Sequence, residues 1–258
     1  MAVSILSERE IRQYSRQIML PEIGVAGQEK LKKASVLVIG AGGLGCPVLQ
    51  YLAAAGIGKI AIAEFDTVSE ANLQRQVLYG SEDLGKLKSI IASKRIEQLN
   101  TLIKTERINV RIDASNSLKI FSGYDIIVDA TDNLKTRYII SDTCVILGQP
   151  MVHGAIYKYE GQVSVFSYRK GPTYRCFNPT PAEGKYTTPE PSKVGLFGVL
   201  PGITGTIMAN EVIKIVTGTG SVLSGKMLLF NILDYSFNIL EIPAIPENQR
   251  ITKLYDDY

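Results

Sequence analysis

Ser35-Val-Leu-Val-Ile-Gly-Ala-Gly-Gly-Leu-Gly45 is the stretch that decides the fold of this chain. An apolar run breaks into the glycine pattern G-x-G-x-x-G, formed by Gly40, Gly42 and Gly45, and a second apolar segment, Val48–Ala55, follows. This order of strand, glycine loop and helix is typical of sites that hold a nucleotide phosphate or ribose against a helix N-terminus. Taken alone, the stretch predicts a dinucleotide-binding enzyme.

A second stretch, Asn72-Leu-Gln-Arg-Gln76, changes that interpretation. It comes just beyond the end of a predicted strand, and open α/β sheets bind their ligands at this edge. Arg75 places a positive charge there, for which a dehydrogenase has no use. The arginine therefore favours a site for the triphosphate of ATP.

The composition is that of an ordinary globular protein. The 258 residues are 45% hydrophobic and 21% charged, enough for one large α/β domain with a buried core. A net charge of +3 is too small to indicate nucleic-acid or membrane binding by its field alone. We see no linker between domains and expect one domain over residues 1–258, with an irregular, proline-rich loop over 171–194.

One uncharged stretch, Ala34–Gly58, is long enough to cross a bilayer. Its glycines and Pro47 divide it into a strand, a turn and a helix, and buried parallel strands have continuous apolar runs. Met1–Glu10 is charged and lacks an apolar signal region. No two cysteines have C-x-x-C spacing. We therefore expect a cytoplasmic protein that does not associate with membranes.

Hydrophobic spacing predicts the order of the elements in the first half. A capping-box pattern, Ser7-Glu-Arg-Glu10, begins a helix over about Ser7–Leu20 that carries Arg16. The first strand, glycine loop and helix follow it. Further elements are then expected at Lys59–Asp66 (strand), from about Gly85 (helix), at Ile108–Ile112 (strand), Tyr124–Asp129 (strand) and Leu134–Leu147 (helix). This order predicts a Rossmann-like, doubly wound and mostly parallel sheet.

The second half has a different pattern. Met151–Phe166 predicts two antiparallel strands with a turn at Glu160-Gly161, and Ile203–Val216 predicts an apolar helix. Lys226–Leu233 and Phe237–Ile242 predict two more strands. We expect antiparallel strands to extend the sheet in this C-terminal half.

Acidic residues end the second predicted strand. Dinucleotide sites place an acidic residue about twenty positions after the glycines, where it binds ribose hydroxyls. Glu64 stands at this place, with Asp66 just behind it. Either residue could instead cap the next turn, and we favour the ribose role for Glu64.

Two further residues have charges that suit ATP. Lys88 falls on the first turn of a predicted helix, where acids are preferred, so a cation there suggests a bound anion. The alternative is a solvated surface lysine. Asp132 follows a strand end and could hold Mg²⁺ with its neighbour Thr131, or it could be the N-cap of the next helix.

Together these residues describe an adenylating site, and here the chain resembles a known family. It is similar to the MoeB/ThiF/HesA adenylyltransferases, the bacterial relatives of ubiquitin-activating enzymes. The matching stretches cover nearly the whole chain in the family's order, and their combination is very specific. They are Tyr14-Ser-Arg-Gln-Ile18, Gly40-Ala-Gly-Gly-Leu-Gly-Cys46, Glu64-Phe-Asp-Thr-Val68, Asn72–Gln76, Gly85-Lys-Leu-Lys88, Asp129-Ala-Thr-Asp-Asn133, Gly154, Gly161-Gln-Val163, Tyr174-Arg-Cys176 and Ala209-Asn-Glu-Val-Ile-Lys214.

The resemblance implies a reaction. Such enzymes bind ATP with Mg²⁺ and the C-terminal Gly-Gly tail of a small ubiquitin-like sulfur-carrier protein of the ThiS or MoaD type. The tail carboxylate attacks the α-phosphorus, which gives an acyl-adenylate and pyrophosphate. A separate sulfur donor later converts the adenylate into a thiocarboxylate for thiamine, molybdopterin or another thiolated product.

The resemblance also implies the site residues. Arg16, Arg75, Lys88 and Asp132 are the candidate catalytic residues, and Arg16 would reach the phosphates of the partner subunit in a homodimer. The implied nucleotide-binding set is Gly40, Gly42, Gly43, Glu64, Asp66, Asn72, Arg75, Lys88 and Asp132, with Asp132 as the Mg²⁺ ligand.

The chain departs from the family's pattern in its cysteines. Relatives often hold zinc with two C-x-x-C pairs, but here the first pair is Thr173-Tyr-Arg-Cys176 and the last residues, Ile251–Tyr258, hold no second pair. We therefore expect no zinc site. Pro189–Ser192 lacks the sulfur-handling cysteine of some members. We favour Cys176 as a remnant of the zinc pair over a reactive thiol.

Cys46 and His153 are expected to be buried, and three other functions of the protein remain as alternatives. We expect Cys46 to pack under the glycine loop and His153, the single histidine, to have a hydrogen-bonded role in the core. The alternative functions are an NAD-dependent oxidoreductase, an adenylating enzyme for another carboxylate or a tRNA base, and a non-catalytic scaffold partner. A dehydrogenase would leave Arg75, Lys88 and Asp132 without a role.

Overall fold

The computed structural model describes residues 4–179, 195–255 and 258. The α-helices are α1 (Glu8–Gln13), α2 (Ser15–Ile18), α3 (Gly24–Lys33), α4 (Gly45–Ala55), α5 (Lys88–Leu99), α6 (Ser117–Phe121), α7 (Leu134–Leu147), α8 (Tyr174–Phe177) and α9 (Leu200–Thr217). The strands are β1 (Ser35–Ile39), β2 (Lys59–Ala63), β3 (Lys104–Ile108), β4 (Ile126–Asp129), β5 (Met151–Tyr157), β6 (Glu160–Phe166), β7 (Lys226–Asn231) and β8 (Ser236–Glu241). Short 3₁₀ helices are η1 (Glu70–Asn72), η2 (Ser81–Asp83) and η4 (Pro246–Gln249).

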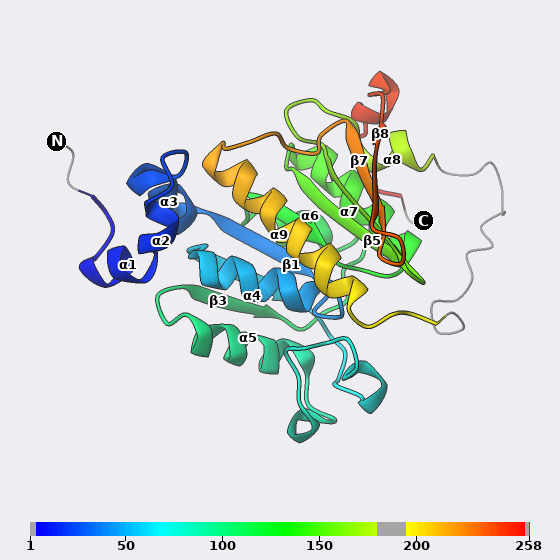
Figure 1. Cartoon of the computed structure of the whole chain (residues 1–258). Helices are drawn as coiled ribbons and strands as arrows, with labels where there is room; N and C mark the ends of the chain where they lie inside the picture. The colour runs from blue at the N-terminus through cyan, green and yellow to red at the C-terminus, as the bar shows by residue number, and fades with distance from the viewer. Residues whose placement is uncertain (1–3, 180–194, 256–257) are drawn as a thin grey trace.

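One sheet with the strand order β3-β2-β1-β4-β5-β6-β7-β8 organises the described residues (Figure 1). The strands from β3 to β5 run parallel to their neighbours. From β5 onward, each strand is antiparallel to the next. The prediction of a Rossmann-like, mostly parallel sheet with an antiparallel extension is confirmed.

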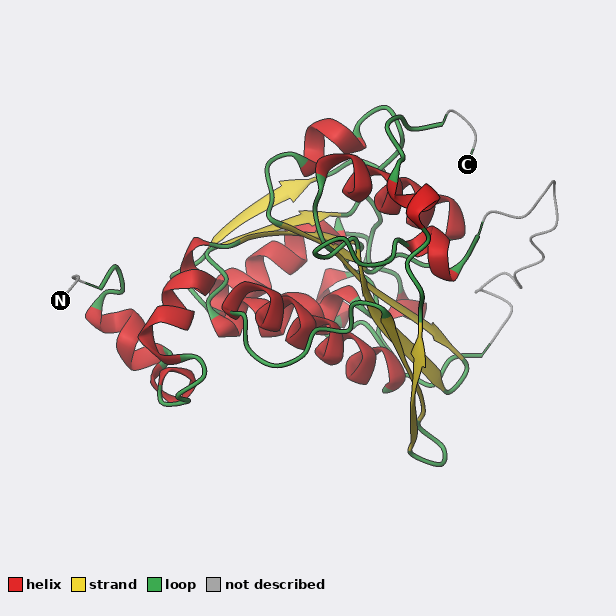
Figure 2. Ribbon diagram, turned by 90° about the horizontal axis from the view of Figure 1, so that it is seen from above, coloured by secondary structure: helices red, strands yellow, loops and turns green. Residues whose placement is uncertain are grey.

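Helices cover both faces of the sheet (Figure 2). Val36 and Val38 of β1 belong to a core that includes residues of α4, α5 and α9. Leu37 and Ile39, which alternate with them, belong to a second core with residues of α6, α7 and α8. Because β1 is buried on both sides, its sequence is apolar throughout rather than alternating.

The uncharged stretch of residues 34–58 has the structure expected for it. It forms β1, the glycine loop and α4, with most of its side chains buried. Among the residues that the structure describes, no helix combines the length and apolar character needed to cross a membrane.

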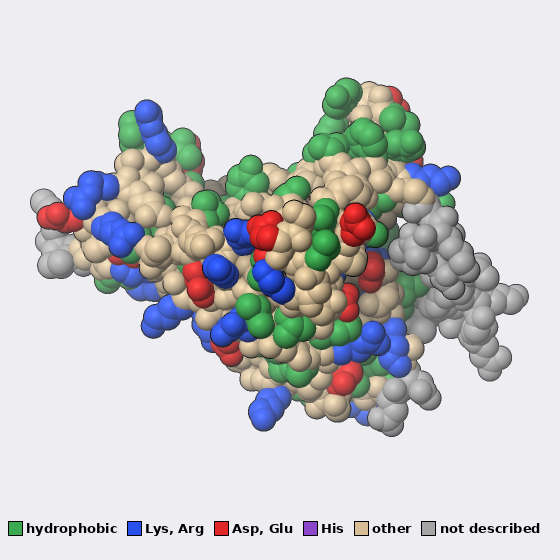
Figure 3. Space-filling view, turned by 90° about the horizontal axis from the view of Figure 1, so that it is seen from below, with side chains coloured by type: hydrophobic (Ala, Val, Ile, Leu, Met, Phe, Trp, Pro, Cys, Tyr) green, Lys and Arg blue, Asp and Glu red, His purple; other side chains and the backbone are tan. Residues whose placement is uncertain are grey.

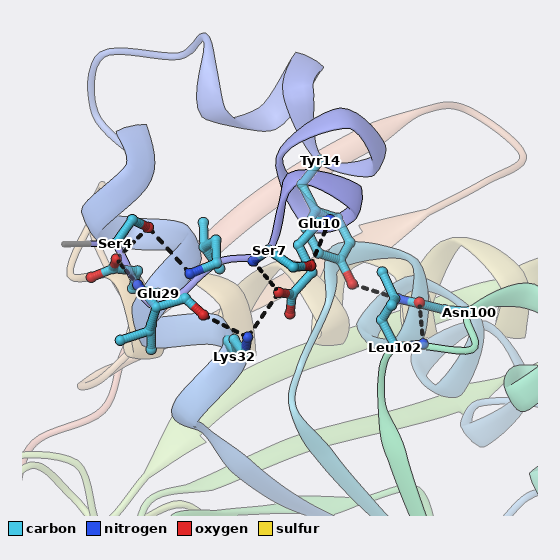
Figure 4. A network of polar contacts seen from close by, with 10 residues as sticks. Ser4, Ser7, Glu10, Tyr14, Glu29, Lys32, Asn100 and Leu102 are labelled. Carbon is cyan, nitrogen blue, oxygen red and sulfur yellow. Dashed lines mark hydrogen bonds and ion pairs between the residues drawn. The ribbon is translucent and has the colours of Figure 1, made fainter.

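The N-terminal helix is confirmed in position but not in continuity. The Ser7 capping box exists: Oγ of Ser7 accepts from the Glu10 N–H at 3.2 Å, and the Glu10 carboxylate accepts from the Ser7 N–H at 2.7 Å (Figure 4). The expected single helix over Ser7–Leu20 is wrong, because Tyr14 leaves helical geometry and divides it into α1 and α2. The Tyr14 hydroxyl accepts a hydrogen bond from Asn100 Nδ2 at 2.8 Å.

Backbone pairing explains the boundaries that were predicted wrongly in the first half. The expected strand Ile108–Ile112 is displaced: β3 ends at Ile108, where its partner β2 also ends. β2 stops at Ala63 instead of Asp66, because residues 66–68 pair with 85–88 instead, through N–H donors of Val68, Gly85 and Lys88. The same pairing delays the start of α5 to Lys88.

The turn expected at Glu160-Gly161 also lies elsewhere. Lys158 and Tyr159 connect β5 to β6, and Lys158 has φ of 52° in the left-handed region. Gly161 lies inside β6, at a position where a Cβ would collide with the Phe230 ring. α9 begins three residues earlier than expected, at Leu200, with Pro201 in its first turn. Three helices were not predicted: α3, α6 and α8.

Candidate functional site

The carboxyl ends of three parallel strands meet at the glycine loop. The Gly40 N–H donates to the Ala63 carbonyl of β2 at 2.9 Å, and the Ala130 N–H, just after β4, donates to the Ile39 carbonyl of β1 at 2.9 Å. Gly40 has φ of +94°, and a Cβ on it would stand 2.7 Å from the Ala130 carbonyl oxygen. Only glycine fits here, so the first glycine brings the β4 loop against the nucleotide loop.

The rest of the loop packs between two helices. A Cβ on Gly45 would collide with the Gly40 carbonyl. The absence of a side chain at Gly45 therefore lets the glycine loop close tightly against the start of α4. A Cβ on Gly43 would stand 3.1 Å from Pro201 Cβ at the start of α9 and 3.7 Å from Arg75 Cδ. The structure therefore brings Arg75 beside the glycine loop, as expected for a phosphate-binding cation.

Glu64 holds the glycine loop in place. One carboxylate oxygen accepts from the Ala41 N–H at 3.0 Å, and the other accepts from the N–H groups of Phe65 and Asp66 at 2.8 and 2.9 Å. The side chain is buried. The capping alternative is thus what the structure shows for Glu64, and its ribose contact stays a prediction.

Lys88 is not a solvated surface lysine. Its side chain is only 6% exposed, and its Nζ lies 3.6 Å from a carboxylate oxygen of Asp66, which is itself 55% exposed. Lys88 is the first residue of α5, at the positive end of the helix dipole. A buried cation in that position is stabilised by anions, and Asp66 supplies one.

Lys88 is also close to the glycine loop, because its N–H donates to the Asp66 carbonyl at 2.9 Å, two residues after Glu64, whose carboxylate accepts from the Ala41 N–H. Burial raises the pKa of the Cys46 thiol to about 12, and the charge of Lys88 partly opposes that rise. Cys46 stands in the first turn of α4, is fully buried and points its Sγ at the Ala41 carbonyl, 3.5 Å away. The expectation that Cys46 packs under the loop is confirmed.

Asn72 and Arg75 lie on one short turn. Asn72 Oδ1 accepts from the Ser69 N–H at 3.3 Å and closes η1. Arg75 Nη1 donates to the Ala71 carbonyl at 2.8 Å, so its guanidinium folds back along its own turn. Both residues are half-buried.

In the loop after β4, one polar residue caps the next helix and another has no described partner. Asn133, not Asp132, is the N-cap of α7, because Asn133 Oδ1 accepts from the Thr136 N–H at 2.9 Å. The capping alternative for Asp132 is therefore wrong. Asp132 is exposed, and neither a hydrogen bond nor an ion pair joins it to another described residue.

Asp129, the last residue of β4, holds this loop through hydrogen bonds to Thr131. One of its oxygens accepts from both the N–H and the hydroxyl of Thr131, at 3.0 and 2.6 Å. The other lies 2.7 Å from His153 Nδ1 and 3.8 Å from Arg137 Nε. Arg137 Nη2 donates to the Thr131 carbonyl at 2.9 Å. Thr131 is thus held through both its backbone groups.

Burial and pairing oppose each other in this cluster. Burial raises the pKa of Asp129, but the hydrogen bond with His153, the charge of Arg137 and the Thr131 hydroxyl outweigh it, and the pKa ends below its ordinary value. Burial lowers the pKa of His153 below 6.5 in spite of Asp129. His153 is therefore a neutral donor in the core, which confirms its expected role.

Sequence reasoning did not assign Asp129, Arg137 or Gln76 to the site. Asp129 was quoted at a strand end in the stretch Asp129–Asn133 but was given no role, and a carboxylate that ends a buried strand and precedes a threonine by two residues is the signal that could have found it. Arg137 lies on α7, one turn after its N-cap, and no spacing rule predicts that it turns back to the loop.

Arg16 lies away from its own glycine loop. Tyr14, two residues earlier, packs at the C-terminal end of α4, where a Cβ on Gly56 would stand 2.6 Å from its ring. The glycine loop lies at the other end of α4, and a helix of 11 residues is about 16 Å long. Figure 1 shows α1, α2 and α3 at one end of the molecule. Arg16 is exposed and has no partner among the described residues.

Cys176 is half-buried near the C-terminal segment. Burial raises the pKa of its thiol, but hydrogen bonds from Thr173, Ile245 and Asn248 bring it below the ordinary value. Residues 4–179, 195–255 and 258 contain no group of three or more His, Cys, Asp or Glu side chains that could hold a metal ion. The Pro189–Ser192 prediction lies outside the described residues.

A cavity of about 410 Å³ opens on the antiparallel part of the sheet. Gly161 and Phe230 line it, with Arg137 at one side. Because Arg137 also binds the Thr131 carbonyl, the cavity adjoins the loop that carries Asp132. Beyond the cavity, the edge strand β8 and the hairpin before it expose large apolar side chains, which are Leu233, Tyr235, Phe237 and Ile239.

Charged side chains of both signs are interspersed on the face shown in Figure 3. They do not gather there into a single field. This mixture of signs agrees with the small net charge of +3.

Comparisons with known proteins identify the family of this chain. The model of the ThiF family matches residues 14–251. A "sulfur carrier protein adenylyltransferase" of Thermus thermophilus is 46% identical over 245 residues, which cover 93% of this chain and 90% of that protein. A "probable molybdopterin-synthase adenylyltransferase" of Porphyra purpurea is also 46% identical, and the match covers 92% of this chain and 62% of that protein.

In longer relatives the match covers only part of the relative's length. The "adenylyltransferase and sulfurtransferase MOCS3" of Xenopus laevis is 44% identical over 99% of this chain, which spans only 58% of its length. Among solved structures, E. coli MccB with ATP has a TM-score of 0.80 at 22% identity, over 95% of this chain and 75% of MccB. At that identity the likeness shows a shared fold.

Proposed function

The chain belongs to the ThiF family, and from this membership we propose that it uses ATP to adenylate the C-terminal carboxylate of a small ubiquitin-like sulfur-carrier protein. The names of the Thermus and Porphyra relatives support an adenylyltransferase that acts on such a carrier. The observation that carries the proposal is the meeting of the glycine loop, Arg75, Lys88 and the Asp132 loop at one edge of the sheet.

These residues have the chemistry that adenylation needs. The carrier's tail carboxylate attacks the α-phosphorus of ATP, a P–O bond forms to the carboxylate oxygen, and the bond to the leaving pyrophosphate breaks with its electron pair. The tail needs no general base, because a carboxylate is already ionised at neutral pH. Arg75, Lys88 and the amide groups of the glycine loop would stabilise the negative charge that grows on the pyrophosphate.

The Asp132 loop suits a magnesium ion. Mg²⁺ in nucleotide sites binds one or two carboxylates and the substrate phosphates. Asp132 is an exposed carboxylate that no described residue engages, on a loop that Asp129 and Arg137 hold in place. The Thr131 hydroxyl donates a hydrogen bond to Asp129, so the lone pairs of its oxygen would be available to a cation. Bound there, Mg²⁺ would neutralise charge on the phosphates.

The antiparallel half of the sheet suits the carrier. The 410 Å³ cavity leads from the exposed β8 surface to Arg137 and the Asp132 loop. Gly161 and Phe230 line this cavity, and a narrow Gly-Gly tail, which carries no side chains, would be able to enter it. Exposed apolar side chains on β8 would contact the folded part of the carrier.

We further propose a homodimer in which Arg16 completes the partner's site. Arg16 is exposed, and Tyr14, two residues before it, packs at the end of α4 that lies away from the glycine loop. The sulfur would come from a separate donor. We place the protein in the cytoplasm, with all three of its cysteines reduced as the structure has them.

Pyrophosphate exchange into ATP tests the adenylation step. We expect labelled pyrophosphate to enter ATP only when protein, Mg²⁺ and a carrier ending in Gly-Gly are all present. The carrier without its last glycine is the control and should give no exchange. Incorporation of labelled pyrophosphate at the same rate without the carrier would contradict the proposed substrate. So would incorporation that requires a free amino acid or a tRNA.

A further inference from the structure

Phe65 is an exposed aromatic side chain at the edge of the sheet where the glycine loop lies. It is 43% exposed and directly follows Glu64, whose carboxylate accepts from the Ala41 N–H of that loop. Open α/β sheets bind their ligands beyond the carboxyl ends of the strands, and Phe65 stands two residues beyond the end of β2. The ring is thus open to solvent and lies on the side of the sheet that binds ligands.

Arg111 lies over the Phe65 ring. The carbon of its guanidinium is 4.9 Å from the ring centroid, and Arg111 is itself exposed. No residue in the described part of the chain forms a hydrogen bond or an ion pair with this guanidinium. A delocalised, planar cation beside an aromatic ring forms a surface on which another flat ring can stack.

Hydrogen bonds hold the segment that carries Arg111 against the elements of the site. The Glu64 N–H donates to the Ile108 carbonyl at 3.2 Å, which joins the ends of β2 and β3. Ser89 Oγ, in the first turn of α5, donates to Asn109 Oδ1 at 2.6 Å. The segment is therefore fixed relative to the end of β2 and to the start of α5.

The order of the strands places this surface on the base side of a bound nucleotide. The glycine loop follows β1, and β2 and β3 lie beside β1 in that order, so the ends of β1 and β3 are about 10 Å apart. In the proposed site the phosphates lie between the glycine loop and Asp132, which follows β4 on the opposite side of β1. The base then extends towards β2 and β3, where Phe65 and Arg111 stand.

We propose that Phe65 and Arg111 form the surface on which the adenine ring of ATP stacks. This inference rests on the proposed use of ATP. A stacked base leaves water and contacts both an aromatic ring and a planar cation. The glycine loop, Arg75 and Lys88 bind phosphates, which inorganic triphosphate also has. Phe65 and Arg111 should therefore affect only the binding of ligands that contain a base.

Binding measurements with ATP and with inorganic triphosphate, each with Mg²⁺, test the assignment. Loss of a stacking partner typically weakens binding about tenfold, so Phe65→Ala should bind ATP about tenfold more weakly and triphosphate as tightly as before. Arg111→Lys keeps the charge but not the plane, and it should weaken the binding of ATP alone. Tyr51→Ala removes an aromatic ring that is 53% exposed on α4 and is the control, which should change neither affinity.

A tryptophan reporter gives a second readout. The chain contains no tryptophan, so Phe65→Trp places a single indole at the proposed surface. We expect ATP to quench its fluorescence and inorganic triphosphate to leave it unchanged, because only ATP brings a ring that stacks on the indole.

Three results would overturn the inference. They are unchanged emission of Phe65→Trp while calorimetry shows that ATP is bound, full affinity of Phe65→Ala for ATP, and an equal loss of affinity for ATP and triphosphate in Phe65→Ala. An unsubstituted protein that binds no ATP would instead overturn the proposed function.

Discussion

His153 and Asp129 form a fully buried pair in which Nδ1 of the imidazole lies 2.7 Å from a carboxylate oxygen. The pair lies beneath the loop that presents Asp132, because the other oxygen of Asp129 binds Thr131. Aromatic rings of Phe166 and Tyr174 enclose the imidazole. The protonation state of one histidine is thereby linked to the stability of the site.

The first prediction concerns pH. Burial lowers the pKa of His153 in the fold below its value of 6.5 in an unfolded chain. The unfolded state therefore binds more protons as the pH falls below about 6.5, and the stability that the neutral imidazole contributes is lost on the acid side of that value. We expect the free energy of unfolding in denaturant titrations to decrease from pH 7 to pH 5.

A single substitution isolates that effect. His153 is the only histidine, so His153→Gln should remove most of the slope between pH 7 and pH 5 while leaving the slope below pH 5, where Asp129 and other carboxylates titrate. An unchanged slope in the variant would show that His153 titrates normally in the fold.

The second prediction concerns Asp132 and Lys88. In the proposed site each would contribute charge where the pyrophosphate leaves, so Asp132→Ala and Lys88→Ala should each raise the barrier to pyrophosphate exchange by roughly 2–4 kcal/mol. Lys86→Ala removes a lysine whose side chain is 54% exposed and serves as the control. Near-normal exchange in both variants would mean that the site is assigned wrongly.

Asp132 and Asn133 should differ in how much they contribute to folding stability. Asn133 caps α7, so Asn133→Ala should cost about 1 kcal/mol of folding stability. Asp132→Ala removes no described hydrogen bond, so its thermal melt should match that of the unsubstituted protein. A large destabilisation by Asp132→Ala would indicate a structural role for this carboxylate.

The third prediction is that the protein binds ATP and not NAD. Arg75 and Lys88 stand beside a glycine loop that would otherwise serve a dinucleotide, and a triphosphate uses both cations. Calorimetry with ATP–Mg²⁺ and with NAD compares them directly. Tight binding of NAD without binding of ATP would favour the oxidoreductase alternative.

The fourth prediction concerns the shared site. Arg16→Ala and Lys88→Ala should each lose exchange activity, and a mixture of the two chains should recover part of it. In a hybrid dimer one site has the intact Lys88 of one chain and the intact Arg16 of the other. Lack of recovery, with subunit exchange demonstrated by a tagged chain, would argue against the contribution of Arg16 across an interface.

The fifth prediction is that untagged protein contains no stoichiometric zinc. A structural zinc site needs four ligands, and Cys176 already accepts hydrogen bonds from the N–H groups of Thr173 and Ile245. Elemental analysis measures the content. One zinc per chain would require ligands that include residues outside those the structure describes.

The sequence predicted the parts of the molecule that depend on local pattern. The glycine loop, α7 and the apolar strands follow from the period of hydrophobic residues and from glycine chemistry, which act within a few residues. Strand boundaries failed where distant pairing decides them: β2 ends early because residues 66–68 pair with 85–88, and β3 ends with β2. No local signal contains that information.

The site was predictable only in its charged residues. Arg75 was proposed because a dehydrogenase has no use for it, and Lys88 because a cation is unfavourable in the first turn of a helix, where acids are preferred. The break at Tyr14 depends on Asn100, which is far away in the chain, and the roles of Asp129 and Arg137 depend on His153 and Thr131. Glu64 was assigned to ribose by its spacing, while the structure shows it binding the backbone of the loop.

The change of strand direction at β5 has a consequence for how such proteins diversify. Parallel strands on one side of β5 support the nucleotide loop, whereas antiparallel strands on the other side carry the cavity and the exposed edge. If the carrier binds to the antiparallel half as proposed, substitutions in β6, β7 and β8 would change the acyl partner while leaving the glycine loop as it is. We expect lineages of this fold to differ most in their antiparallel strands and least around Gly40 and Asp129.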